Sequence, residues 1–483
     1  MNLDPGICYQ AICSRDARFD GRFFTAVRTT GVYCRPVCPA PTPKRENVEF
    51  FLCAAAAEGA GFRPCRRCRP ETAPGTPAWE GTSTIVSRAL RLIAQGNCDE
   101  NGLEKIAERV GVGSRHLRRL FVRHIGVAPK AVLQTQQAHF ARRLIDETDL
   151  PIARVAFAAG FHSIRRFNQA ILKSFGAPPT ILRRMTPRGR SSGSALTMKL
   201  EYRPPFDWQV LLDFLRTRAI PGVESVDQNT YQRSIELDGQ SGLLEVRPGE
   251  NAPHLILRIY LPPTARLAQI IDRIRRLFDL TADPIRIADH LGLDPLLSRM
   301  IRSMPGLRVP GAWDPFEMMV RAVLGQQISV KAASTLAGRI AKTFGSPIIT
   351  NIPARVTHVF PRAKVLRSVD LRQVGLTEAR ARTVRRIAEA VCNGELPTDS
   401  ASGLDSIVNS LNAIDGIGNW TAQYIAMRAF GEPDAFPEGD LGLRRAVSSG
   451  AEPVSNSELK RMAEHWRPWR AYAAMYLWNC AHQ

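Results

Sequence analysis

The spacing of hydrophobic residues in the middle of the chain predicts a pair of similar helical units. Apolar side chains near residue 105 recur at the i, i+3, i+4, i+7 spacing of a helix, namely Leu103, Ile106, Ala107 and Val110. Two glycines in 111–113 end this helix, and Ser114 can N-cap a second one. The same pattern returns 49 residues later, where Ser163 can cap the second helix of the pair. A helix over 132–145 joins the two units, and each has the form of a helix-turn-helix motif.

The pattern changes in the C-terminal part of the chain. Short apolar runs alternate with turn residues between 198 and 275, and runs such as 234–237 and 254–260 predict strands. From Phe316 onward the apolar spacing is close to 3.6 residues, as in helices. The helices predicted there are 318–326, 331–344, 377–392 and 404–413. We therefore expect an α+β region followed by an all-α region.

Two stretches rich in Pro, Gly and Ser divide the chain. They cover 71–81 and 186–194, and their composition is typical of linkers. Since one domain takes about 150 residues, a chain of 483 residues is long enough for several domains. The predicted domains are 1–78, 79–186, 196–307 and 308–483.

The chain is strongly basic, and the charge is unevenly distributed. Lys and Arg number 65 against 45 acidic residues, which gives a formal net charge of +20. Residues 1–195 hold 30 basic and 15 acidic side chains, or +15 of this excess. A hydrophobic content of 44% is ordinary for folded protein, so the charge lies on a folded surface rather than on a disordered tail. The expected partner is a polyanion, by default a nucleic acid.

No feature of the sequence indicates a membrane or a secreted disulfide scaffold. No apolar run approaches the ~20 residues that span a bilayer, and the first charged residue is Asp4 rather than a basic one. Ten cysteines in 483 residues are too sparse for a disulfide framework. We therefore expect a soluble protein of the cytoplasm, associated with the nucleoid and without a membrane partner.

Four of the cysteines form two closely spaced pairs, Cys34-x3-Cys38 and Cys65-x2-Cys68, with 26 residues between the pairs. This arrangement is typical of a tetrahedral site in which four thiolates bind one Zn²⁺. From the spacing alone, a purely structural zinc site is the better interpretation, because most closed four-cysteine sites only stabilise a fold.

The sequence around these cysteines closely resembles the N-terminal zinc domain of the Ada DNA-repair regulators. The matching runs are AVRTTGVYCRPVC (26–38), KRENV (44–48) and GFRPCRRC (61–68). In that family one zinc-bound thiolate takes a methyl group from a DNA phosphotriester, and the matching residue is Cys34. The resemblance implies that the other three cysteines are inert ligands and that transfer is stoichiometric. Methylation would make the site less negative and so strengthen DNA binding.

The paired helix-turn-helix units resemble, over 83–184, the DNA-binding domain of AraC-type regulators. That domain also follows the zinc domain in Ada regulators, so the resemblance implies promoter DNA as a partner, with RNA polymerase as a further candidate. The side chains expected to face a major groove or its phosphates are Arg115, His116, Arg118, Arg119, Arg165 and Arg166. The alternative is a solvated basic face without a DNA role.

A glycine-rich run, LNAIDGIGNWTA, has the form of a hairpin between two helices. The amides around Gly416 and Gly418 can bind a DNA phosphate. In similar helix-hairpin-helix motifs, backbone carbonyls at the positions of Asn412, Ile414 and Ile417 also hold a monovalent cation, Na⁺ or K⁺. Taken alone, the run is equally compatible with a simple helical corner.

The C-terminal block resembles the AlkA-type 3-methyladenine DNA glycosylases II over nearly all of 198–483. The matching runs are PPFDW (204–208), RLFDL (276–280), GLRVPG (306–311), VLGQQIS (323–329), DAFPEGDLGLR (434–444) and HWRPWR (465–470). The resemblance implies that Asp440 is the catalytic aspartate. An alkylated purine is already a cationic leaving group, so the enzyme mainly needs a carboxylate that stabilises the sugar cation and orients water. The alternative role of Asp440 is to cap the helix that follows it.

Other residues of the glycosylase family can be placed by the same resemblance. Trp420, Tyr424 and Trp478 match the aromatic base pocket, whereas helical spacing alone would favour core packing. Gln327 matches the residue that intercalates when the base is flipped. The AlkA-type glycosylase that the chain resembles has an apolar residue at this position. Bifunctional relatives have a lysine at the position of Trp420, so we expect a monofunctional enzyme. No PCHR run occurs, so we do not expect the guanine-methyl acceptor domain of Ada.

These features predict a multidomain fold with four parts. They are a small α+β four-Cys zinc domain, an all-α double helix-turn-helix domain, an α+β glycosylase N-terminal subdomain and an all-α helix-hairpin-helix domain. The predicted function is repair of alkylated double-stranded DNA by a monomeric glycosylase that is also a suicide methyltransferase and a transcription regulator. The alternative is a methylation-activated regulator whose glycosylase block only binds DNA.

Overall fold

The computed structural model describes residues 4–74, 84–94, 102–185, 195–237, 239–250, 252–261, 267–348, 355–397, 403–448 and 452–480. The chain forms two compact units. The first comprises Met1–Pro204, Gly249–Asp272 and Leu280–Ala282, and the second comprises Pro205–Pro248, Arg273–Asp279 and Asp283–Gln483. The predicted boundary between residues 78 and 79 and the predicted linker 186–194 lie outside the described residues.

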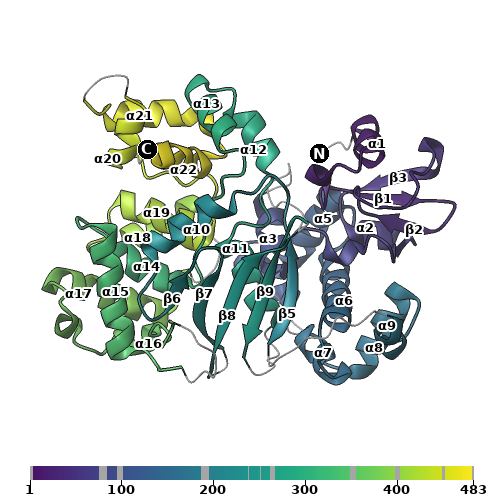
Figure 1. Ribbon diagram of the computed structural model, residues 1–483, viewed down its shortest axis with the longest axis horizontal. Helices are drawn as coiled ribbons and strands as arrows, with labels where there is room; N and C mark the ends of the chain where they lie inside the picture. Colours follow the sequence, from purple (N-terminus) through teal and green to yellow (C-terminus); the bar gives the residue numbers. More distant parts are fainter. Residues whose placement is uncertain are drawn as a thin grey trace. The chain divides into compact units, whose positions relative to one another are not determined.

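The first unit begins with a four-stranded sheet and short helices (Figure 1). Its elements are α1 (Pro5–Cys13), β1 (Phe24–Val27), β2 (Val32–Cys34), β3 (Val48–Phe51), α2 (Ala54–Gly59) and β4 (Arg63–Pro64). The strand order is β3-β1-β2-β4, with β1 antiparallel to both neighbours and β2 parallel to β4. Because β2 and β4 are parallel, their carboxyl ends meet at the same end of the sheet. Cys34 closes β2 and Cys65 follows β4, so this topology brings the two cysteine pairs together.

A helical region follows in the first unit. Its elements are α3 (Thr84–Ala94), α4 (Gly102–Arg109), α5 (Ser114–Ile125), α6 (Pro129–Glu147), α7 (Ile152–Ala158), α8 (Ile164–Phe175) and α9 (Pro179–Met185). Leu117 and Phe121 of α5 are buried, as are Phe167 and Ile171 at the matching positions of α8. The two helix-turn-helix units, α4–α5 and α7–α8, and their connecting helix α6 confirm the prediction from periodicity.

The start of α5 differs from the sequence prediction. Gly113 occupies the N-cap position without a side-chain cap, and the amide of Leu117 donates to the carbonyl of Gly113 at 3.0 Å. Ser114 is therefore the first helical residue and not the cap, because the helix starts one residue earlier than expected. In the second copy Ser163 does cap α8, with its hydroxyl accepting from the amide of Arg166 at 3.5 Å.

Both units contain antiparallel strands. In the first unit β5 (Leu196–Glu201) pairs with β9 (His254–Tyr260). In the second unit β6 (Glu224–Val226), β7 (Tyr231–Leu237) and β8 (Gln240–Pro248) form a meander, and α10 (Trp208–Arg218) packs beside β6. The predicted strands 234–237 and 254–260 lie in β7 and β9.

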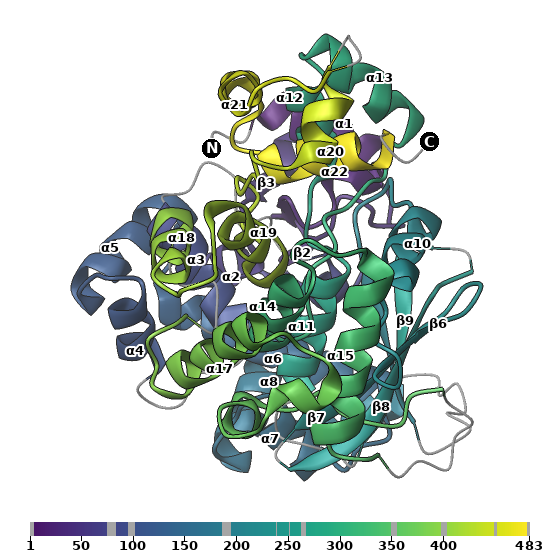
Figure 2. The same cartoon turned by 90° about the vertical axis from the view of Figure 1, so that its left-hand side faces the viewer.

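The chain after β9 is mainly helical, as the apolar spacing predicts (Figure 2). Its helices are α11 (Leu267–Leu277), α12 (Pro284–Leu291), α13 (Pro295–Ser303), α14 (Pro315–Leu324), α15 (Val330–Phe344), α16 (Ala363–Leu366), α17 (Glu378–Cys392), α18 (Leu404–Asn412), α19 (Asn419–Phe430), α20 (Leu441–Ala446), α21 (Asn456–Ala463) and α22 (Arg470–Cys480). Helix α14 begins three residues before the predicted start because Asp314 caps it, accepting from the amide of Glu317 at 3.1 Å. It is buried over most of its length and packs against α15, α17 and α19.

In the described part of the chain, every helix is too short or too polar to cross a lipid bilayer.

Candidate functional site

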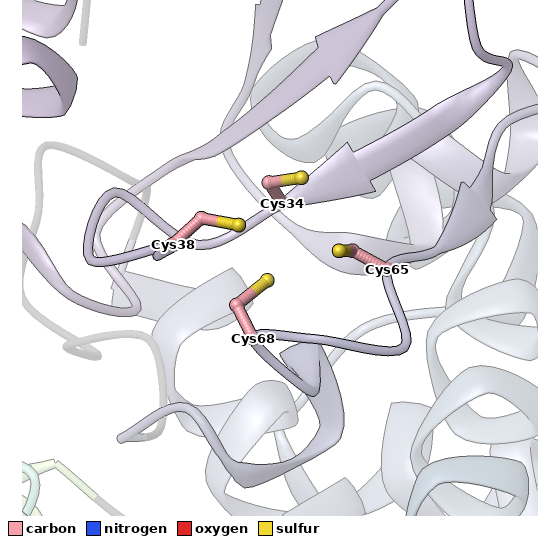
Figure 3. Close-up of side chains that lie close together, drawn as sticks. All are labelled: Cys34, Cys38, Cys65 and Cys68. Atoms are coloured by element: carbon pink, nitrogen blue, oxygen red, sulfur yellow. The ribbon is translucent and has the colours of Figure 1, made fainter. Parts of the chain in front are cut away.

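The thiol groups of Cys34, Cys38, Cys65 and Cys68 point toward one another in the first unit (Figure 3). Their sulfur atoms all lie within 4.8 Å of one another. A tetrahedral zinc ion with Zn–S bonds of about 2.3 Å needs sulfurs roughly 3.8 Å apart, so both the donor set and the spacing fit one Zn²⁺. The amide of Cys65 donates to the carbonyl of Tyr33 at 2.9 Å, which holds the two pairs side by side.

The close approach of the thiols shifts their acidities. Hydrogen bonding with Cys34 lowers the pKa of Cys38 to about 7. Hydrogen bonds with Cys34 and Cys38 also lower the pKa of Cys65, while the pKa of Cys34 is raised because it shares its proton with these neighbours. Zinc binding requires the cysteines as thiolates, and the proximity of the four thiols favours this form for Cys38 and Cys65.

Backbone amides donate to sulfurs of the cluster. The amide of Arg35 donates to Sγ of Cys68 at 3.3 Å. Cys38 and Cys65 also accept hydrogen bonds from backbone amides. N–H donors withdraw electron density from a thiolate, so these contacts make Cys38, Cys65 and Cys68 weaker nucleophiles.

Arg35 cross-links the segments that carry the cysteines. Its Nε donates to Oδ1 of Asp20 at 2.9 Å, and its Nη1 donates to Oγ1 of Thr72 at 2.6 Å and to the carbonyl of Cys68 at 3.3 Å. Burial acts to lower the pKa of Arg35, but its contacts with Asp20 outweigh this effect and raise it. The sequence gives only one signal for this role, the position of Arg35 directly after Cys34 in the matched run.

A buried polar network connects β2 with α6. The hydroxyl of Tyr33 donates to Oε1 of Glu58 at 2.9 Å, and Nε2 of His139 lies 3.0 Å from the same oxygen. Thr135 donates to Oε2 at 3.0 Å. Burial acts to raise the pKa of Glu58, but the contacts with His139, Tyr33 and Thr135 together lower it. The residue next to Cys34 is thus tied to the helix that joins the two helix-turn-helix units, a link that no sequence pattern indicates.

The predicted DNA-contacting residues lie on α5 and α8. The exposed ones are Arg115, Arg118 and Arg119 on α5, and Arg165 and Arg166 on α8. His116 is half-buried, and its Nδ1 lies 2.9 Å from Nη2 of Arg119. Exposed guanidinium groups on second helices of this kind can bind phosphate oxygens or the acceptor edge of guanine.

Asp440 lies in the second unit, directly before α20. Its Oδ1 accepts from the amide of Leu443 at 3.0 Å, so the predicted capping role is confirmed. The same oxygen accepts from the indole N–H of Trp478 at 3.0 Å, and Oδ2 accepts from the indole N–H of Trp420 at 3.0 Å. Three N–H donors therefore fix the orientation of a half-buried carboxylate.

Aromatic rings surround this carboxylate. Trp420 and Tyr424, one turn apart on α19, stack with centroids 5.4 Å apart and planes inclined by 5°. Trp478 of α22 meets Tyr424 edge-on at 6.2 Å. The hydroxyl of Tyr424 accepts from Nη1 of Arg428 at 2.8 Å. Burial acts to raise the pKa of Tyr424, but Arg428 and two further arginines lower it. Electron-rich rings beside an anion can hold a flat cation.

The turn between α18 and α19 has the geometry of a tight hairpin. Gly416 has φ +89°, and a Cβ there would lie 2.2 Å from Oγ1 of Thr383, so glycine is required on both counts. At Gly418 a Cβ would meet no atom within 4 Å, so the start of α19 is open. The amide of Ile417 donates to the carbonyl of Ile414 at 3.0 Å, and Asn412 ends α18. Of the three carbonyls predicted to bind a cation, that of Ile414 already accepts one hydrogen bond.

Gln327 lies in the loop between α14 and α15. It is exposed and adopts a left-handed backbone conformation with φ +57°, which is uncommon for a residue with a side chain. The structure thus brings the three predicted pocket aromatics and Asp440 together, and it places the predicted intercalating residue on the surface of the same unit.

Four family models match successive parts of the chain. They are the metal binding domain of Ada (residues 7–71), a helix-turn-helix domain (106–185), the AlkA N-terminal domain (197–314) and the HhH-GPD superfamily of base excision DNA repair proteins (320–471). Among solved structures, a 3-methyladenine DNA-glycosylase from Archaeoglobus fulgidus has the same fold over 59% of this chain and 98% of its own, with a TM-score of 0.52 and 23% identity.

Curated relatives cover the chain both in parts and as a whole. It is 33% identical over 284 residues to the DNA-3-methyladenine glycosylase 2 of Escherichia coli, covering 58% of this chain and 95% of the relative. It is 44% identical over 136 residues to the E. coli bifunctional transcriptional activator/DNA repair enzyme Ada, covering 28% of this chain and 36% of the relative. A probable bifunctional transcriptional activator/DNA repair enzyme AlkA of Mycobacterium tuberculosis is 42% identical over 483 residues, or 99% of this chain and 97% of the relative. The chain therefore belongs to the AlkA-type family of bifunctional transcriptional activator/DNA repair enzymes.

Proposed function

We propose that this protein removes alkylation damage from DNA by two separate reactions, base excision in the second unit and stoichiometric methyl transfer in the first. The observation that carries the proposal is the carboxylate of Asp440, which two indole N–H groups and a helix amide hold beside stacked aromatic rings. A domain that only grips DNA needs cations and amides at the phosphates, and a carboxylate that merely caps a helix does not need two further indole donors.

In the excision reaction, Asp440 faces the anomeric carbon of a nucleotide flipped out of the duplex. The N-glycosidic bond breaks, its electron pair leaves with the cationic purine, and positive charge develops on the sugar. The Asp440 carboxylate stabilises that charge and orients the attacking water. Trp420, Tyr424 and Trp478 hold the cationic base through their π faces. The indole at position 420 offers no amine for a Schiff base, so the reaction stops at an abasic site.

In the methyl transfer, Sγ of Cys34 attacks the methyl carbon of a DNA phosphotriester. The S–C bond forms as the C–O bond breaks, and the electron pair of that bond stays on the phosphate, which becomes an ordinary diester anion. When bound, zinc keeps all four thiols deprotonated at neutral pH. Cys34 is the acceptor that the resemblance to the Ada regulators indicates, and backbone amides donate to the other three sulfurs. Since the thioether is neutral, the charge of the four-sulfur centre with its dication changes from roughly −2 to roughly −1, which reduces repulsion from DNA.

Several further features belong to the same proposal. The domains are placed at 1–78, 79–186, 196–307 and 308–483, and the protein acts as a monomer on alkylated and promoter DNA. The exposed arginines of α5 and α8 bind the promoter, and RNA polymerase is the downstream partner of the regulator. The carbonyls of Asn412, Ile414 and Ile417 hold one monovalent cation, Na⁺ or K⁺. A buffer in which a bulky organic cation replaces Na⁺ and K⁺ should therefore weaken DNA binding by the hairpin.

The test of the excision reaction is release of free 3-methyladenine from methylated duplex DNA by the native protein and by Asp440→Asn. Asparagine retains the helix cap and much of the hydrogen bonding, so the variant should fold and bind DNA like the native chain. Release by the native protein alone would support the proposal. No release by either would favour a methylation-activated regulator whose C-terminal block only clamps DNA. Equal release by both would keep the enzyme and refute the role of Asp440.

A further inference from the structure

The loop between α14 and α15 carries two successive glutamines with different environments. Gln327 is exposed in a left-handed conformation, whereas the side chain of Gln326 turns toward the protein. Nε2 of Gln326 donates to the carbonyl of Gly416 at 2.9 Å and to Oγ1 of Thr421 at 3.0 Å. One primary amide therefore contacts both the hairpin turn and the first turn of α19.

The backbone of Gln326 is held as well. A guanidinium nitrogen of Arg380, on α17, donates to its carbonyl oxygen. The same helix supports the hairpin through Thr383, whose hydroxyl donates to the carbonyl of Asp415 at 3.0 Å and packs against Gly416. The loop and the hairpin thus share one hydrogen-bonded frame although they lie 90 residues apart in the sequence.

The frame continues to the proposed reaction centre. Thr421 is buried and follows Trp420, whose indole N–H holds Oδ2 of Asp440 at 3.0 Å. Any displacement of the loop relative to α19 would change the position of Gln327 with respect to this carboxylate. A left-handed backbone at a residue with a side chain persists only where its surroundings hold it, and the hydrogen bonds of Gln326 to Gly416, Thr421 and Arg380 provide that support.

We propose that Gln326 is a positioning residue for base flipping. It fixes the intercalating Gln327 to the hairpin, so that the hairpin that binds the DNA backbone and the side chain that fills the gap in the base stack move as one rigid unit. This inference rests on the proposed glycosylase function. Gln326 does not touch the reacting atoms; its effect is confined to substrates whose target base must be extracted from a duplex. A base in single-stranded DNA needs no plug, so its excision should depend little on Gln326.

The experiment compares the full-length native protein with Gln326→Met, which keeps the length of the side chain but removes both N–H donors. Gln373→Met is the matched control, because Gln373 is an exposed glutamine of the same unit. Release of methylated purines is measured from the same methylated DNA in duplex and in single-stranded form. Fluorescence of 2-aminopurine beside the lesion reports unstacking of the duplex.

The expected result is a loss of duplex excision by Gln326→Met on the order of tenfold to a hundredfold, with single-strand excision within about twofold of native and a reduced 2-aminopurine signal. Gln373→Met should match the native protein in all three measurements. An equal loss on both substrates, or no loss on the duplex, would overturn the positioning role. Absence of base release by the native protein on either substrate would overturn the proposed function, and the positioning role with it.

Discussion

The two side chains proposed to react, the thiol of Cys34 and the carboxylate of Asp440, have different surroundings. The thiol of Cys34 lies among three other cysteine thiols, and all four sulfurs are within 4.8 Å of one another. Asp440 receives three N–H donors, two from indoles and one from the helix that it caps. A nucleophile has to keep its electron pair available, whereas a carboxylate that acts through its charge gains from being fixed in place. These surroundings fit the two proposed roles, a thiol that is consumed and a carboxylate that is reused.

The largest expected effect is on methyl transfer, which should be lost while base excision continues. Cys34→Ala, or removal of zinc with a chelator, should abolish uptake of labelled methyl groups from methylated DNA, because the proposed acceptor thiolate is lost. Base release should continue, since Asp440 and its donors lie in the other unit.

The matched control is Cys13→Ala, which alters an exposed cysteine of α1. It should accept about one methyl per chain, like the native protein. Methyl uptake by Cys34→Ala at the native level would show that another cysteine is the acceptor, and it would contradict the role proposed for Cys34.

The next largest effect concerns the donors to Asp440. Trp478→Phe or Trp420→Phe keeps an aromatic ring but removes one hydrogen bond to the carboxylate, and each should lower kcat by about ten- to a hundredfold, because a hydrogen bond to a charged group is worth ~1.5–3 kcal/mol. Steady-state excision kinetics on methylated duplex DNA would measure this effect.

Trp469→Phe is the control for these variants. Trp469 is buried in the same unit and packs against Tyr472, without a described bond to Asp440. If it lowered kcat as much as Trp478→Phe does, general packing rather than orientation of the carboxylate would explain the loss.

A smaller effect is expected on stability in the first unit. Glu58→Gln replaces the carboxylate that joins Tyr33 to His139 and Thr135. It should destabilise the first unit by about 1–3 kcal/mol. Calorimetry would show this as a lower midpoint temperature for the unfolding transition of that unit. Glu108→Gln, at an exposed position of α4, should leave the transition unchanged.

The pH dependence of this contribution follows from the lowered pKa of Glu58. The ordinary pKa of a glutamate side chain is 4.5, and the pKa of Glu58 in the folded protein lies below it. The stabilisation is therefore fully present above the unfolded pKa and is lost as the pH falls through the folded pKa. The difference in stability between the native protein and Glu58→Gln should shrink on acidification below pH ~4.5. A difference that grows in acid would contradict the assignment.

The smallest effect is expected on DNA affinity. Arg118→Ala or Arg165→Ala removes one exposed cation from α5 or α8. If the lost contact is to a phosphate, the slope of log K against log salt should become less steep by about 0.9, with a several-fold loss of affinity at moderate salt. An unchanged slope in both variants would assign these arginines to a solvated face.

Short-range features of this protein follow from the sequence by itself. The two cysteine pairs, the helical spacing of 103–110 and its return after 49 residues are local patterns, and the structure contains the zinc-type cluster and both helix-turn-helix units that they predict. The capping role of Asp440 is also local, because the amide that it binds lies three residues away. Even here the detail at Ser114 is wrong, because one hydrogen bond to Gly113 moves the start of the helix.

Only the tertiary structure decided which side chains support the reactive groups. Gln326 reaches Gly416 across 90 residues, and His139 reaches Glu58 across 81 residues. The indoles that hold Asp440 come from two helices, α19 and α22. A single hydrogen bond between distant residues leaves no periodicity in the sequence, because its geometry depends on how whole helices pack. The spacing of ligands is therefore visible in the chain, whereas the donors that tune and position them appear only once it is folded.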